Sequence, residues 1–68
     1  MFRNLSAELV RHGIKVKDLA EYIGVSPKTA SNKLNGKSEF TLSEINKISS
    51  LFPTMEVAYL FATDGESA

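Results

Sequence analysis

The amino-acid sequence predicts a compact all-α domain built from five short helices. Apolar residues recur at spacings of three and four, which is the period of a helix with one buried face, and strand-type alternation is weak. Glycines 13, 24 and 36 interrupt these stretches at positions that suit helix C-termini, and Pro53 stops a later one. The expected helices cover about 4–12, 16–23, 27–35 and 42–52, followed by a short helix that begins near Thr54.

Capping residues mark three of the expected helix starts. Asn4 is expected to cap the first helix. Ser26 followed by Pro27 favours the start of the third helix, because proline suits the first helical position. Thr41 and Glu44 have the spacing of a capping box for the fourth helix. The apolar residues expected to face inward from the last two helices are Leu42, Ile45, Ile48, Leu51, Phe52, Val57, Leu60 and Phe61.

Length and composition limit the classes of protein that we expect. The 68 residues suit one domain, with an ordered core over about 4–61 and a frayed end over 64–68. The chain has no cysteine and one histidine, His12, so we expect no disulfide, no metal site and no cofactor. No nucleophile motif or glycine-rich phosphate loop is present, which disfavours an enzyme. Because neither a membrane-spanning run nor a secretory leader is seen, we expect a cytoplasmic protein.

Charge is distributed unevenly along the chain, although the formal net charge is zero. Residues 1–37 carry seven Lys or Arg against three Asp or Glu, whereas residues 38–68 carry one against five. The stretch 27–38 holds three lysines and no acid. A basic surface with an acidic opposite side is typical of a polyanion binder, and chance clustering on a solvated surface is the alternative.

The stretch from Leu19 to Ser26 predicts a helix-turn-helix unit. Ala20 is small where a second helix must approach closely, and Gly24 permits the positive φ that a sharp turn requires. Val25 can fill the interior of the turn, and Ser26 caps the helix that follows. These features together predict two short helices that cross at a steep angle.

The third helix has a polar side whose chemistry suits DNA bases. Ala30 and Leu34 lie about 40° apart around the helix axis and form its inward stripe. Lys28 and Asn32 lie on the opposite side, where lysine can bind guanine and asparagine can pair with adenine. A solvated helix surface is the alternative interpretation.

The run KDLAEYIGVS at 17–26, together with Asn35-Gly36-Lys37, resembles the Cro and phage-repressor helix-turn-helix family of XRE type. The later runs TLSEI at 41–45 and VAYLF at 57–61 are similar to the helices that complete that domain, so the resemblance covers about residues 4–61. It implies a five-helix fold like that of lambda repressor, a homodimer on a pseudo-palindromic operator of double-stranded DNA, and transcriptional control.

The resemblance also implies roles for individual residues. The residues expected to contact bases are Pro27, Lys28, Thr29 and Asn32, although a proline can act only through contact or shape. Helix N-termini and nearby cations are expected to contact phosphates, and the candidates are Lys15, Val16, Lys17, Lys33, Asn35 and Lys37. The family usually has glutamine at position 16, so Val16 would act through its backbone. A hydrophobic dimer interface would involve Met55, Tyr59 and Phe61.

These observations favour a sequence-specific DNA-binding repressor of Cro type, encoded by a phage or prophage, that acts by occluding a promoter. One alternative is a protein-interaction module on the same fold, such as an antitoxin-like protein or the partner of an antirepressor. A second alternative is the excised N-terminal domain of a longer repressor. We expect neither a membrane nor a small molecule as a partner.

Overall fold

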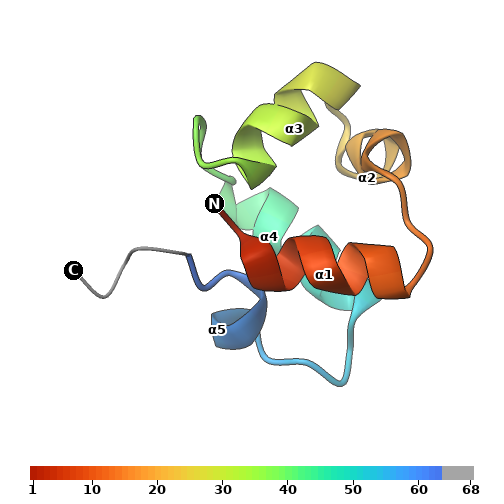
Figure 1. Ribbon diagram of the computed structural model, residues 1–68, viewed down its shortest axis with the longest axis vertical. Helices are drawn as coiled ribbons and strands as arrows, with labels where there is room; N and C mark the ends of the chain where they lie inside the picture. The colour runs from red at the N-terminus through yellow and green to blue at the C-terminus, as the bar shows by residue number, and fades with distance from the viewer. Residues whose placement is uncertain (64–68) are drawn as a thin grey trace.

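The computed structural model describes residues 1–63, and this part of the chain contains helices and turns but no strand. The helices are α1 (Arg3–Arg11), α2 (Val16–Ile23), α3 (Pro27–Leu34), α4 (Leu42–Leu51) and α5 (Val57–Leu60). α3 and α5 lie at opposite ends of the view in Figure 1, with α1 and α4 between them. The predicted all-α fold is therefore confirmed, whereas the predicted fraying of 64–68 lies outside the described residues.

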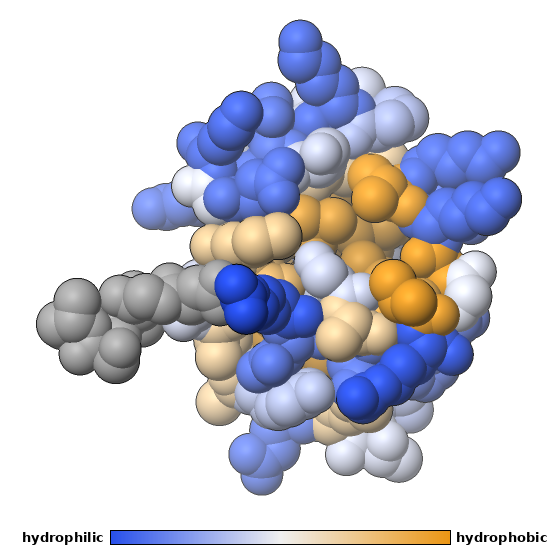
Figure 2. All heavy atoms as spheres, viewed as in Figure 1, coloured by the Kyte–Doolittle hydropathy of each residue, from blue (hydrophilic) through white to orange (hydrophobic). Residues whose placement is uncertain are grey.

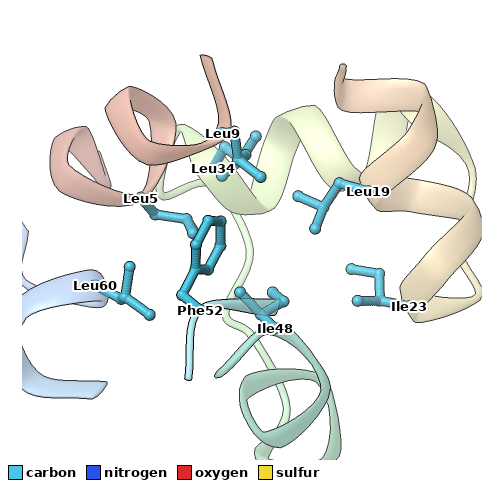
Figure 3. Packing of buried hydrophobic residues seen from close by; sticks show 8 residues of the cluster. All are labelled: Leu5, Leu9, Leu19, Ile23, Leu34, Ile48, Phe52 and Leu60. Atoms are coloured by element: carbon cyan, nitrogen blue, oxygen red, sulfur yellow. The ribbon is translucent and has the colours of Figure 1, made fainter. Parts of the chain in front are cut away.

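All five helical segments contribute to one hydrophobic core. Figure 3 shows its side chains directed toward a common interior, with the ring of Phe52 near the centre. Each fully buried aliphatic or aromatic side chain contributes about 1.5–3 kcal/mol relative to an exposed one. Helices of four to ten residues have only marginal stability in isolation, so packing into this shared core stabilises them. Its buried members are Leu5, Leu9, Leu19, Ile23, Leu34, Ile48, Phe52 and Leu60.

The turn between α2 and α3 has the predicted geometry. Gly24 has a φ of +84°, and its N–H donates to the carbonyl of Ala20 over 2.8 Å. Val25 N–H reaches the same carbonyl over 2.9 Å and therefore closes the end of α2. The Ser26 hydroxyl accepts the Thr29 N–H over 3.2 Å, which caps α3 as expected.

The end of α3 is closed by a Schellman motif centred on Gly36, whose φ is +84°. The Lys37 N–H donates to the carbonyl of Asn32 over 2.9 Å, and the Gly36 N–H donates to that of Lys33 over 3.1 Å. The Phe2 N–H donates to the carbonyl of Leu34 over 2.9 Å. The start of the chain is thereby attached to the end of α3.

The predicted capping box of α4 is also confirmed. The Thr41 hydroxyl accepts the Glu44 N–H over 3.1 Å, while the Glu44 carboxylate accepts the Thr41 N–H over 2.9 Å. Leu42 does not belong to the buried stripe, because its side chain is 74% exposed. At about 100° per residue it lies about 120° around the helix from Ile48, so it faces away from the core.

Two predictions at the ends of the chain are wrong. Asn4 does not cap α1, which begins at Arg3; its side-chain amide instead donates to the carbonyl of Tyr59 over 2.9 Å. α5 begins at Val57 rather than near Thr54. Val57 is 46% exposed, because this single turn directs only Leu60 fully into the core.

Glu8 joins α1 to α5 through a buried carboxylate that the sequence did not indicate. Its Oε2 accepts bonds from Arg11 Nη1 over 2.8 Å and from the Tyr59 hydroxyl over 3.0 Å. The hydrogen bond to the Glu8 carboxylate raises the pKa of the Tyr59 hydroxyl above its ordinary value. His12 donates from Nδ1 to the Glu8 carbonyl over 2.8 Å, and its ring packs edge-on against Phe52. The bond between the Tyr59 hydroxyl and Glu8 fixes the last helix against the first.

We expect Ile48→Ala to lower the free energy of unfolding by about 2–5 kcal/mol, because it leaves a cavity in the core. Leu42→Ala is the matched control on the same helix, and its effect should stay within about 0.5 kcal/mol, since the side chain is exposed. Urea unfolding followed by circular dichroism measures both. Equal losses in the two variants would contradict the orientation of α4.

Candidate nucleic-acid interface

The outward side of α3 is polar and contains no acidic residue. Ala30 and Leu34 are buried, as predicted, and therefore direct the opposite side of the helix away from the core. Figure 2 shows hydrophilic side chains gathered over the α3 end of the molecule. α3 is thus an exposed helix held by one apolar stripe, and its polar side is available to a ligand.

The four residues expected to contact bases have different environments. Pro27 and Lys28 are exposed in the first turn of α3. Thr29 is half-buried, and its hydroxyl oxygen accepts a hydrogen bond from the Ser26 hydroxyl over 3.0 Å. Asn32 is half-buried, and within residues 1–63 its side-chain amide has no hydrogen-bond partner. The structure therefore brings the four residues together, with the amide of Asn32 available for bonding.

Lys15, Val16 and Lys17 are exposed at the start of α2. The first N–H groups of a helix have no partner within the helix, which makes this end suitable for a phosphate. The Asp18 carboxylate accepts the Lys15 N–H over 3.2 Å. Its negative charge offsets part of the positive potential, so the two lysine side chains carry the attraction for an anion here.

An apolar groove of about 480 Å³ lies beside the start of α2. Figure 2 shows its hydrophobic surface between α1, α2 and α3. Val16 borders the groove, and its side chain can form no hydrogen bond. Only the backbone of Val16 could therefore bond a phosphate. The lining residues are Ser6, Leu9, Val10, Gly13, Ile14, Lys15, Val16 and Leu34.

The turn after α3 provides the second group of phosphate candidates. Asn35 and Lys37 are exposed, and the Schellman motif at Gly36 holds their backbone. This turn and α2 lie on opposite sides of α3 in Figure 1. Cationic and polar groups therefore flank the polar side of α3.

Lys33 does not belong to this surface, contrary to the prediction. Its side chain is turned toward α4, and the residue is only 8% exposed. The Nζ atom donates to Glu44 Oε1 over 2.9 Å and to the carbonyl of Glu39 over 3.0 Å. It also lies 5.9 Å from the centre of the Phe40 ring. Because the ammonium is satisfied inside the protein, we remove Lys33 from the phosphate candidates.

Glu44 is the buried partner of Lys33, in addition to its predicted role as a capping residue. Burial by itself raises the pKa of its carboxyl, but the hydrogen bonds from Lys33 and from the Thr41 backbone outweigh burial. The pKa is therefore below its ordinary value. The position of Lys33 beside the inward stripe of α3 was the only signal for this pair, and it did not identify the partner.

The three candidates for a dimer interface are not equally exposed. Tyr59 is 41% exposed, although its hydroxyl is directed to Glu8. Met55 is partly buried against the core. Phe61 packs edge-on against Phe2 and Phe40, with ring centres 5.8 and 5.4 Å apart. The exposed Val57, which the sequence predicts to face inward, adds an apolar side chain at this end.

Comparison with protein families agrees with this geometry. The model of the Cro/C1-type HTH DNA-binding domain matches residues 4–54, a range that includes α1 to α4. The chain belongs to this family, and it is a DNA-binding regulator. It has no significant match among curated proteins or among solved structures. Within residues 1–63, no helix combines the length and apolar character needed to cross a bilayer.

We expect the Lys33–Glu44 pair to make stability depend on pH. The pKa of Glu44 is lower in the folded chain than the ordinary value of 4.5, so its contribution is present above that pH and is lost as the pH falls through the folded pKa. Glu44→Gln should lower the free energy of unfolding by about 1–3 kcal/mol at pH 7, and the difference should shrink toward pH 3. Urea unfolding at several pH values measures this.

Glu21→Gln is the control for this measurement, because Glu21 is an exposed acid on another helix. It should leave the free energy of unfolding within about 0.5 kcal/mol of the wild type at pH 7. A difference between wild type and Glu44→Gln that stays constant from pH 7 to pH 3 would contradict the expected role of the carboxylate.

Proposed function

We propose that the protein binds a specific DNA operator through α3 and represses transcription by occluding a promoter. The observation that carries the proposal is the acid-free polar side of α3, which the core leaves exposed. Such a helix fits the major groove, where each base pair presents a distinct pattern of donors and acceptors. In this proposal the regulator is encoded by a phage or prophage and acts in the bacterial cytoplasm.

Lys28 and Asn32 provide the direct base contacts in this proposal. The Lys28 ammonium donates to O6 and N7 of guanine, and the Asn32 amide pairs with N6 and N7 of adenine. The Thr29 methyl group contacts the methyl group of thymine, and Pro27 acts by shape alone. The unpartnered amide of Asn32 supports this assignment, because no bond within the described residues must break before it binds a base.

The groups that flank α3 hold it in register on the DNA backbone. Lys15 and Lys17 contact phosphate with their side chains, and Val16 does so with its backbone N–H. Asn35 and Lys37 contact a second phosphate from the turn after α3. Their exposure supports the assignment.

The operator in this proposal is pseudo-palindromic and binds a homodimer. Met55, Tyr59 and Phe61 form the dimer interface, together with the exposed Val57. Two copies related by a twofold axis would place their α3 helices in major grooves about 34 Å apart. The partly exposed apolar side chains at this end of the molecule support the interface.

Selection of bound duplexes from a random DNA library should recover two symmetry-related half-sites, one helical turn apart. The affinity for the selected site should fall linearly with salt on a log–log scale, with a slope of about −0.9 for each phosphate contacted. Fluorescence anisotropy measures this slope. Binding without salt dependence or sequence preference would overturn the repressor function and would favour a protein-interaction module.

Asn32→Ala and Lys28→Ala should each weaken binding to the selected site by about 1–3 kcal/mol and relax the preference at one base pair. Lys47→Ala is the matched control, because Lys47 is an exposed cation on α4, away from the proposed surface. Anisotropy titrations on the selected site and on single-base variants separate the two effects. Equal weakening on every sequence would assign the residue to phosphate contact instead.

A further inference from the structure

We propose that the Lys33–Glu44 ion pair positions the turn after α3 for contact with the DNA backbone. The inference deepens the proposed function and rests on it. Both residues are positioning residues, since neither is placed against DNA. The pair would act on Asn35 and Lys37 indirectly, by fixing the end of the segment 35–41 at Glu39 and Thr41.

The pair connects the end of α3 directly to the start of α4. Lys33 Nζ and Glu44 Oε1 are 2.9 Å apart, and the two side chains are only 10% and 11% exposed. A contact of this length between two largely buried charges restricts the distance and the orientation of the helices that carry them.

The same two side chains also bond the backbone of the intervening segment 35–41. Lys33 donates to the carbonyl of Glu39, and Glu44 accepts the N–H of Thr41. The first part of the segment is held by the Schellman motif, in which the Lys37 N–H donates to Asn32. The motif therefore fixes the beginning of the segment, and the ion pair fixes its end.

Burial of two charges has a desolvation cost that offsets much of their attraction, so such pairs contribute little to stability compared with apolar residues of similar volume. The pair instead selects one conformation of the turn, because its hydrogen bonds to Glu39 and Thr41 can all form in only that conformation. A turn already held in place loses less conformational entropy when Asn35 and Lys37 bind a phosphate. Loss of the pair should therefore weaken DNA binding even where apolar replacements keep the chain folded.

The test is the double variant Lys33→Met/Glu44→Leu, which replaces the pair by apolar side chains. Its free energy of unfolding should fall less than that of Glu44→Gln, because no buried charge is left unpaired, although the capping bond to the Thr41 N–H is lost. Its affinity for the selected site should fall roughly 3- to 10-fold, and the log–log salt slope should become shallower by about 0.9, the loss of one phosphate contact. Amide hydrogen exchange at 38–41 should be faster in the DNA-free variant.

Lys47→Met is the matched control, because it removes an exposed cation from α4 without touching the turn. It should leave amide exchange and the salt slope unchanged. If the double variant does not fold, Lys33→Met provides the comparison, since it removes the bond to the Glu39 carbonyl while Glu44 still accepts the Thr41 N–H.

An unchanged salt slope in the folded double variant would overturn the proposed positioning role, whatever its stability. Unchanged exchange at 38–41 would equally show that the pair does not hold the turn. A wild-type protein without salt-dependent DNA binding would instead overturn the proposed function and, with it, the role of the pair in phosphate contact. Amide exchange at 38–41 distinguishes the failure of the positioning role from the failure of the proposed function, because it is measured on the protein without DNA.

Discussion

The close packing of α2 against α3 is the constraint on which the proposed DNA surface depends. Ala20 and Ala30 are both almost completely buried, and their small side chains allow the two helices to approach closely. Gly24 lets the chain reverse direction between them without strain. Once Ala30 and Leu34 are directed into the core, helical geometry leaves Lys28 and Asn32 on the outer side. The polar surface of α3 is thus a consequence of how its apolar stripe is buried.

Much of the fold could be predicted because its signals are local. The left-handed turn at Gly24, the cap formed by Ser26 and the capping box of Thr41 each depend on residues within four positions of one another. The exposure of Lys28 follows from the phase of a single helix. The expectation that Leu42 faces inward rests on its apolar character, and it is wrong because its angle from Ile48 places the side chain outside the stripe.

The remaining features depend on residues that are distant in sequence. The partners of Lys33, Glu8 and Asn4 lie 11, 51 and 55 residues away, respectively. No local pattern identifies such pairs, because they arise only when the helices have packed. Lys33 lies beside the inward stripe of α3, and the presence of Glu44 on the neighbouring helix directs its ammonium inward.

Charge on the proposed DNA surface is therefore smaller than the sequence indicated. One of the three lysines in 27–38 is neutralised inside the protein by Glu44, which leaves Lys28 and Lys37 exposed on this stretch. The lysines at the start of α2 become correspondingly more important for attraction to the DNA backbone. Because the cations lie mostly in residues 1–37 and the acids mostly in 38–68, a chain with no formal net charge can still present a cationic surface.

Contact between the outer side of α3 and the DNA bases is tested most directly by NMR titration of the ¹⁵N-labelled protein with a selected duplex. We expect the largest shift changes at the side-chain amide of Asn32 and at the backbone amides of 28–32, with smaller changes at 15–17 and almost none at 48–51. Changes confined to the apolar groove or to α5, with the α3 signals unmoved, would contradict it.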